Sequence, residues 1–287
     1  MSKNLEVKTV VQSPLYGGQV IIAEDSTRKL LYFTDLYRTY KVGDVVFEDE
    51  IMEQSISFND TRIDSHLASD YTRVMAASMY CHTHKFGRRH NAPVSRTALH
   101  LGMGLAGLPR YLQFHGLYNV AVEMDPAVVY AASFHYNLNF PILTCHASAG
   151  LTTVKGTYDL VFFDCFTHED IGVAEEFTEF QFCKKLGKAV SPEGILVLNT
   201  YGAESKYKAN RDELLRRMNH QGFVHAIIFT APKYSSYDNV VIYMSRERLS
   251  LAKLKSNLAT LSISKEHEGL TTMASHALTW TAQTLEL

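Results

Sequence analysis

The sequence ALHLGMGLAG at residues 98–107 is an apolar strand that runs into a glycine-rich turn, and it decides the fold. Three further segments follow in a set order: NVAVEMDP at 119–126, YDLVFFDCF at 158–166 and SPEGILVLNTY at 191–201. The second and third place an acid just after an apolar run, and the fourth is a turn that leads into a buried strand. Together they indicate a nucleoside-binding α/β domain, because each element brings a turn or a carboxylate to one edge of a sheet.

Strands alternate with helices through this part of the chain, which predicts a mostly parallel sheet covered by helices. Near its end, 223–230 and 239–245 are two apolar strands whose connection is too short for a parallel return, so they predict an antiparallel pair. A parallel sheet that finishes in an antiparallel hairpin is typical of class I methyltransferase-like, Rossmann-like α/β folds. The predicted strands of the parallel part are 98–102, 119–124, 142–145, 158–164 and 194–199, and its predicted helices are 107–115, 126–138 and 175–190.

The N-terminal part has a different pattern. VKTVVQS, QVIIAED and LLYFTDLY, separated by short turns, predict consecutive antiparallel strands. From about Leu67 the apolar residues recur at helical spacing, with Asp64 or Ser65 as the expected N-cap. We therefore divide the chain into an N-terminal β-domain (1–65), a linker helix and basic loop (66–96), an α/β domain (97–245) and a C-terminal extension of no assigned function, helical at first (246–287).

Composition excludes several classes of protein. Of the 287 residues 46% are hydrophobic, and 28 basic residues against 30 acidic ones give a net charge of −2, which argues against nucleic-acid binding. There is no apolar run of signal-peptide or membrane-span length, so we expect a cytoplasmic protein without a membrane partner. The four cysteines are scattered and favour buried free thiols. His82, His84 and His90 share no ligand spacing with a cysteine or carboxylate, so no metal is expected.

The candidate nucleoside-binding residues lie around the glycine turn. Gly102, Gly104 and Gly107 form a GxGxxG pattern, in which missing Cβ atoms let the backbone approach a nucleoside at the start of a helix. Glu123 follows at the tip of the next strand, where a carboxylate can accept both ribose hydroxyls. The alternative is that Glu123 and Asp125 merely begin a helix, where acids favour the dipole.

Asp164 is the candidate catalytic acid. It ends an apolar and aromatic strand at the carboxyl edge of the sheet, where open α/β folds bind ligands. The alternatives are a helix cap or a partner for a buried base. Its placement, together with the terminal hairpin, disfavours an NAD-dependent oxidoreductase.

Residues 13–245 resemble the polyamine aminopropyltransferases, the spermidine synthase family, and especially its divergent bacterial spermidine synthase-like members. The resemblance rests on LGMGLAGLPRYL, VAVEMDPAVVYAASFHYNL, YDLVFFDCF and SPEGILVLNTY, and on the N-terminal segments SPLYGGQVIIAED, EQSISF and SDYTRVM. It implies a small β-domain followed by a methyltransferase-like domain, and dimers formed through the β-domain.

The resemblance also implies roles for single residues. Glu123 matches the acid that holds the donor ribose, Gln54 a glutamine that lies over the donor, Asp164 the catalytic aspartate and Tyr71 the tyrosine of a Tyr-His-Glu motif. His146, with Ala147 beside it, falls where an aspartate contacts the adenine amino group. The chain departs from the family at His146, at Thr72 and Arg73, which replace the histidine and glutamate, and at Leu105, which replaces an aspartate that helps hold the diamine.

These observations predict a transferase that moves an alkyl group, most simply aminopropyl from decarboxylated S-adenosylmethionine, to an amine. The donor is a co-substrate, and no tightly bound cofactor is expected. Five acids in THEDIGVAEEFTEF after Asp164 suit a cationic acceptor or, equally, a solvated helix start. Two alternatives stay open: a methyltransferase that uses S-adenosylmethionine itself, and a non-catalytic binding protein that retains the fold.

Overall fold

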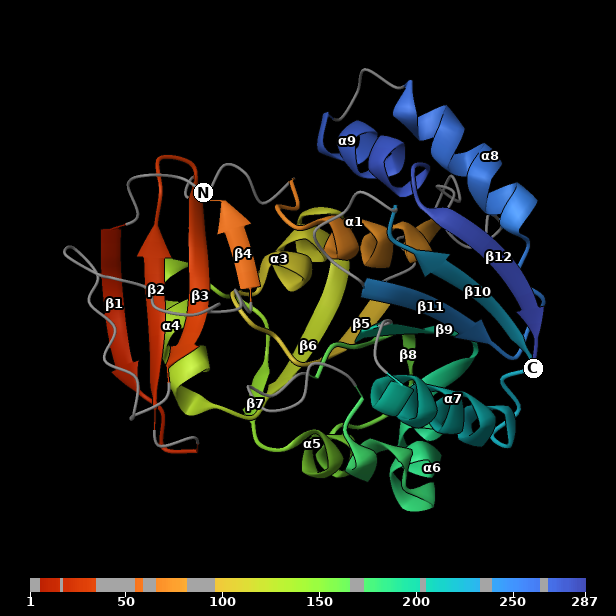
Figure 1. The fold of residues 1–287 in the computed structure, drawn as a ribbon, viewed down its shortest axis with the longest axis horizontal. Helices are drawn as coiled ribbons and strands as arrows, with labels where there is room; N and C mark the ends of the chain where they lie inside the picture. Colours follow the sequence, from red (N-terminus) through yellow and green to blue (C-terminus); the bar gives the residue numbers. More distant parts are fainter. Residues whose placement is uncertain are drawn as a thin grey trace.

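The computed structural model of the chain describes residues 6–15, 18–34, 55–58, 66–81, 96–165, 173–201, 205–232, 239–263 and 268–287. These residues form two β-sheets that lie side by side (Figure 1). The N-terminal sheet is antiparallel and confirms the predicted strands. It contains β1 (Glu6–Gln12), β2 (Gln19–Glu24), β3 (Arg28–Thr34) and β4 (Ser55–Phe58), in that order.

The larger sheet has the strand order β12-β10-β11-β9-β8-β5-β6-β7. The strands from β9 to β7 run parallel, whereas β11, β10 and β12 are antiparallel to their neighbours. This confirms the methyltransferase-like α/β class, including its antiparallel hairpin. The strands are β5 (Arg96–Leu101), β6 (Leu117–Glu123), β7 (Ile142–Thr144), β8 (Tyr158–Phe163), β9 (Val190–Tyr201), β10 (His225–Thr230), β11 (Asn239–Ser245) and β12 (Thr281–Glu286).

Helices cover both faces of this sheet, so its strands are buried runs of apolar residues. One face carries α1 (Asp70–Ala77) with the short 3-10 turn η2 (Ser78–Tyr80), α3 (Gly107–Phe114), α8 (Leu251–Ser262) and α9 (Glu268–Ala277). The other face carries α5 (Ala147–Thr153), α6 (Phe180–Ala189) and α7 (Ser205–Asn219) (Figure 1).

The two sheets are joined by a third apolar cluster. Helix α4 (Pro126–His135) packs against β1 and β2 of the N-terminal sheet as well as against β6 and β7. Val20, Ile22 and Leu31 from that sheet meet Leu105 of the glycine turn and Val128 of α4 in this cluster. The N-terminal sheet is therefore packed directly on the turn that follows β5.

Some sequence-based boundaries were wrong. The helix predicted over 175–190 is a 3-10 turn, η3 (Glu175–Thr178), followed by α6, because Glu179 between them is extended. Phe177 of η3 is buried against Phe163 and Phe182, with ring centroids 5.0 and 4.9 Å apart, and this packing overrides helical continuity. Helix α5 was not predicted at all.

Two further differences concern element ends. Helix α1 begins at Asp70 with Ser69 as its N-cap, so the expected caps Asp64 and Ser65, which lie outside the described residues, were wrong. Strand β9 is longer than predicted, and four of its residues, 191–194, bulge out of register against β8, where a turn had been expected.

The C-terminal extension completes the larger fold. Helix α8 packs beside η2, α9 packs on α1, and β12 pairs with β10 as an additional edge strand that the sequence did not indicate. None of the described helices combines the length and apolar character needed to cross a bilayer.

Candidate active site

A cavity lies at the carboxyl ends of β5, β6 and β8. The strand order reverses between β5 and β8, and open α/β sheets bind ligands at such a point. Residues from the N-terminal sheet, from the start of α1 and from the start of α5 close the cavity. The predicted site residues brought together in its lining are Tyr71, Gly102, Gly104, Gly107, Glu123, His146, Ala147 and Asp164. Gln54 lies outside the described residues.

Gly102 packs tightly against the backbone of Asp164 at the base of the cavity. Its φ is +85°, and a Cβ there would lie 2.1 Å from the backbone oxygen of Asp164, so only glycine fits. The backbone N–H of Gly102 donates to Val122 O (2.9 Å), and that of Asp164 donates to Leu101 O (2.8 Å). The glycine turn and the strand-tip aspartate are therefore in direct backbone contact.

Glu123 turns back onto the glycine loop. Its Oε2 accepts the N–H of Met103 (3.0 Å) and of Gly104 (3.4 Å), and its Oε1 accepts the N–H of Met124 (2.8 Å) and of Asp125 (3.1 Å). Burial raises the pKa of the Glu123 carboxyl, and these four donors partly offset that rise. The loop amides that would otherwise face a ligand anion already hold this carboxylate.

Asp125 begins a helix, as the alternative interpretation of the two acids predicted. It is the N-cap of α4, its Oδ1 accepts the N–H of Ala127 at 2.8 Å, and Pro126 occupies the first helical position. Of the two acids in the EMDP segment, one therefore caps the helix and the other, Glu123, faces the glycine loop.

Asp164 is surrounded by side chains rather than amides. The Nδ2 of Asn199 donates to its Oδ1 at 2.7 Å, and the hydroxyl of Tyr71 on α1 donates a second hydrogen bond. Burial raises the pKa of the Asp164 carboxyl to about 6, with Glu123 adding to the rise and the two donors opposing it. A carboxyl with this pKa can take or release a proton near neutral pH.

Asn199 is a site residue that sequence reasoning missed. It lies in β9, is almost fully buried, and its Oδ1 accepts a hydrogen bond from Asn239 of β11 (3.0 Å). The signal available in the sequence was a polar residue inside the apolar run ILVLNTY, because a buried amide needs a partner.

His146 is the N-cap of α5, which explains why this helix was overlooked, since histidine is not a favoured cap. Its Nδ1 accepts the N–H of Ser148 at 3.3 Å, its ring stacks on Phe177, and its Nε2 lies 3.3 Å from Glu176 Oε1. Glu176 also lines the cavity. Of the other acids expected near the site, Glu175 and Glu179 are exposed, and Glu169 and Asp170 lie outside the described residues.

Leu105 has a packing role. It is fully buried in the cluster that joins the N-terminal sheet to α4, and it is absent from the cavity lining. Leu105 therefore contributes to packing beneath the N-terminal sheet and does not line the cavity.

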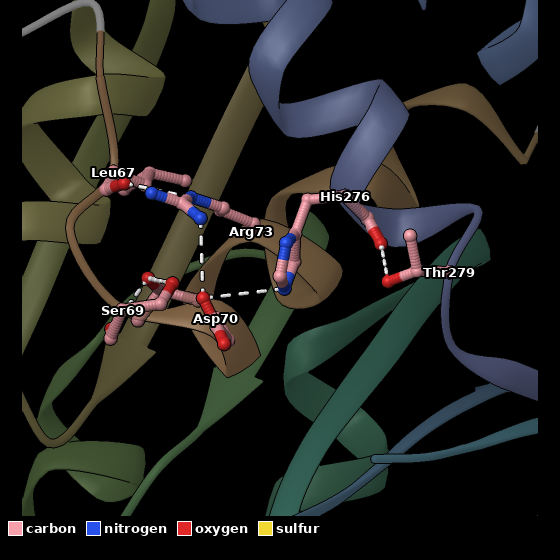
Figure 2. A network of polar contacts seen from close by, with 7 residues as sticks. Leu67, Ser69, Asp70, Arg73, His276 and Thr279 are labelled. Carbon is pink, nitrogen blue, oxygen red and sulfur yellow. Dashed lines mark hydrogen bonds and ion pairs between the residues drawn. The ribbon is translucent and has the colours of Figure 1, made fainter. Parts of the chain in front are cut away.

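Thr72 and Arg73 secure the beginning of α1. Thr72 donates its hydroxyl to Ser69 O (2.8 Å), and Arg73 donates to Leu67 O (2.9 Å) and contacts Asp70 Oδ1 (3.2 Å). Figure 2 shows that His276, from α9 at the other end of the chain, also reaches Asp70, with Nε2 3.3 Å from Oδ1. The C-terminal extension thereby supports the helix that carries Tyr71.

The charge of the cavity is one-sided. Its described lining contains four carboxylates, Glu123, Asp125, Asp164 and Glu176, and neither a lysine nor an arginine. Three histidines, His66, His100 and His146, are its further titratable nitrogen bases. A cavity of this composition favours a cationic ligand over an anionic one.

These features define a methyltransferase-like α/β fold with an additional N-terminal antiparallel sheet. No protein-family model and no curated protein matches the chain. Several solved structures are similar to it in fold. A probable spermidine synthase from Corynebacterium glutamicum superimposes with a TM-score of 0.67 at 16% identity, covering 98% of this chain and 91% of that one.

Two further structures show the range of the likeness. A spermidine synthase in complex with the transition-state analogue AdoDATO has a TM-score of 0.56 at 12% identity, covering 94% of this chain and 83% of that one. Human methyltransferase-like protein 13 in complex with SAH has a TM-score of 0.55 at 15% identity, covering 72% of this chain and 93% of that one. The match to the spermidine synthase spans almost the whole chain and so includes the N-terminal sheet, whereas the match to the methyltransferase-like protein covers a smaller share.

Proposed function

We propose that the protein transfers an aminopropyl group from decarboxylated S-adenosylmethionine to an amine. The observation that carries this proposal is the carboxylate of Glu123 on the amides of Met103 and Gly104. A glycine loop can bind the carboxylate of an amino acid or a pyrophosphate through such amides. In this chain the two amides already donate to the carboxylate of Glu123, which favours a donor molecule that has no carboxylate of its own.

The composition of the cavity supports the same donor. Decarboxylated S-adenosylmethionine carries a sulfonium and an ammonium, so it is more cationic than S-adenosylmethionine. Among the described lining residues no lysine or arginine is available to pair with a carboxylate, and four acids favour positive charge. An NAD-dependent reaction is disfavoured for the same reason.

The adenosyl end of the donor would lie over Glu123, His146 and Ala147. Glu123 Oε2 accepts one close hydrogen bond, from Met103 N–H at 3.0 Å, and one weaker bond, from Gly104 N–H at 3.4 Å. It is therefore the carboxylate oxygen with acceptor capacity left for ribose hydroxyls. His146, stacked on Phe177 at the start of α5, would border the adenine in this proposal. Gln54 is included in this proposal on the resemblance alone.

The chemical step is a displacement at carbon. The amine nitrogen uses its lone pair to form a bond to the aminopropyl carbon next to sulfur. The carbon–sulfur bond breaks, and its electron pair returns to sulfur, which leaves as neutral methylthioadenosine. Asp164 accepts the proton that the new ammonium releases, and Tyr71 holds Asp164 and orients the amine.

Assembly and domain division belong to the same proposal. The resemblance implies a homodimer formed through the N-terminal β-domain, taken as residues 1–65. In the described part of that sheet β1 is an edge strand with Val10 half exposed, so its outer edge is open to a partner. Sedimentation of the intact chain would test this.

The proposal is tested by calorimetric titration with methylthioadenosine, decarboxylated S-adenosylmethionine and S-adenosylmethionine, followed by a transfer assay with short amines. Preferred binding of the first two, with turnover that Asp164→Asn abolishes, is the expected result. Tighter binding of S-adenosylmethionine would assign methyl transfer instead. Binding of none of the three would leave a non-catalytic protein that retains the fold.

A further inference from the structure

His100 is a buried titratable residue that the proposed chemistry does not use. It lies one residue before the carboxyl end of β5, is 1% exposed, and lines the cavity. Its ring is stacked on Phe162 of β8, with centroids 5.0 Å apart and planes 9° from parallel. A histidine held this firmly at a cavity floor has one fixed orientation toward any ligand.

The neighbouring strand fixes the tautomer of His100. Asn119 Nδ2 donates to Leu117 O (3.0 Å), so its Oδ1 faces His100 Nε2 at 2.9 Å and accepts from it. The proton of the neutral ring is therefore on Nε2, and Nδ1 carries a lone pair. No hydrogen bond from a described residue reaches Nδ1. Burial lowers the pKa of His100 to about 4, so the ring stays neutral at physiological pH and does not repel a cation.

His100 sits below the proposed reaction centre. It is paired in register with Phe162. Two residues further along each chain, just after the ends of β5 and β8, lie Gly102 and Asp164. Residues two apart in a strand lie on the same face, about 6.6–6.8 Å apart. Leu67 of the segment before α1 and Leu108 of α3 line the cavity on this face and pack in one apolar cluster with Phe162.

We propose that His100 Nδ1 accepts a hydrogen bond from a second donor group on the acceptor amine, which makes it a specificity-determining residue. This inference rests on the proposed function. An amine whose reacting nitrogen is at Asp164 would run its carbon chain past Phe162 between Leu67 and Leu108. A chain of roughly four or five carbon atoms spans the distance to His100. The site therefore selects a chain with an ammonium or hydroxyl at its far end over a simple alkylamine.

The experiment measures kcat/KM for 1,4-diaminobutane, 4-aminobutan-1-ol and n-butylamine with the wild-type chain, His100→Leu and His100→Gln. We expect His100→Leu to lower kcat/KM for the two bifunctional amines about tenfold or more, because a hydrogen bond to a charged or buried donor is lost. Its activity on n-butylamine should stay within about threefold of wild type. His100→Gln, which keeps a polar acceptor, should recover part of the preference.

Two controls separate the possible failures. Methylthioadenosine binding and n-butylamine turnover by the wild-type chain test the proposed function itself. Suppose that both are present. If His100→Leu then lowers kcat/KM equally for all three amines, or for none of them, the proposed role of His100 is contradicted. If neither His100 variant folds, the 15N resonance of His100 Nδ1 in the wild-type chain decides. With methylthioadenosine bound, it should shift on adding 1,4-diaminobutane but not n-butylamine, and equal or absent shifts would overturn the inference.

Discussion

The two acids at the tips of β6 and β8 face the same cavity but are held in different ways. Glu123 receives four backbone N–H groups, all from residues within 20 positions of it in the chain. Asp164 receives two side-chain donors, from Tyr71 on α1 and Asn199 on β9. The hydrogen bonds of Glu123 are thus local in the chain, whereas those of Asp164 come from distant segments.

This difference matches the proposed division of labour. Amides hold Glu123 in place, as suits a residue that positions a donor. Side chains leave Asp164 with a pKa of about 6, as suits a residue that exchanges a proton. The following changes test this contrast, from the largest expected effect to the smallest.

Asp164→Asn should reduce the rate of transfer about 10²–10⁴-fold, because the proton acceptor is lost while Asn199 can still donate to the new side-chain oxygen. Methylthioadenosine affinity should change little. The measurement is kcat under single-turnover conditions beside a calorimetric Kd. Retained turnover would remove Asp164 from the chemistry.

Glu123→Gln should weaken methylthioadenosine binding about tenfold or more and lower the free energy of unfolding by about 1–3 kcal/mol, because its amide group would face backbone N–H donors. Asp159→Asn is the matched control. Asp159 also accepts a backbone N–H, from Thr97 at 3.0 Å, but it lies at the other end of β8. An equal loss of affinity in both variants would contradict a ribose role for Glu123.

The same buried carboxyl should make stability depend on pH. The folded-state pKa of Asp164, about 6, is above its ordinary value of 3.8, so the folded state binds this proton more tightly than the unfolded one. Its contribution is most favourable below about pH 4 and is lost as pH rises to about 6. Above pH 6 Asp164→Asn should be more stable than wild type by about 1–3 kcal/mol, and the gap should close toward pH 4 in urea titrations. A gap that does not change with pH would contradict this.

Asn199→Ala should move the acidic limb of the kcat/KM profile to higher pH, because a donor that stabilises the Asp164 carboxylate is removed. In the wild type this limb should lie near pH 6. Thr200→Val is the control, since Thr200 follows Asn199 in β9 but donates its hydroxyl to Val240 O of β11. If the acidic limb of the kcat/KM profile also moves in Thr200→Val, the shift reflects a disturbance of β9 and not the loss of the hydrogen bond to Asp164.

His276→Gln should have the smallest effect, below about 1 kcal/mol in the free energy of unfolding, because a half-buried pair with Asp70 contributes little. Transfer activity should stay within a few-fold of wild type. Chemical denaturation and KM for the amine measure the two quantities. A large rise in KM with unchanged stability would mean that α9 controls the position of Tyr71.

Prediction from sequence succeeded where the signal was local and periodic. The strands of the parallel sheet, the antiparallel hairpin and the N-terminal strands are all present, and the cavity gathers Gly102, Glu123 and Asp164. It failed where packing decided: Phe177 interrupts a helix, His146 caps one, and β12 joins an edge. None of these has a pattern of its own in the sequence.

The sequence by itself determined the fold class and the two acids at neighbouring strand tips, because hydrophobic periodicity and glycine turns act over a few residues. The tertiary structure alone decided the surroundings of those acids. It turned Glu123 onto the loop amides, brought Tyr71 and Asn199 to Asp164, and buried Leu105 beneath the N-terminal sheet. It also placed His100 at the cavity floor with Phe162 and Asn119. Hydrogen bonds and burial between residues far apart in the chain exist only once the chain has folded, and they set the charge and pKa of the site.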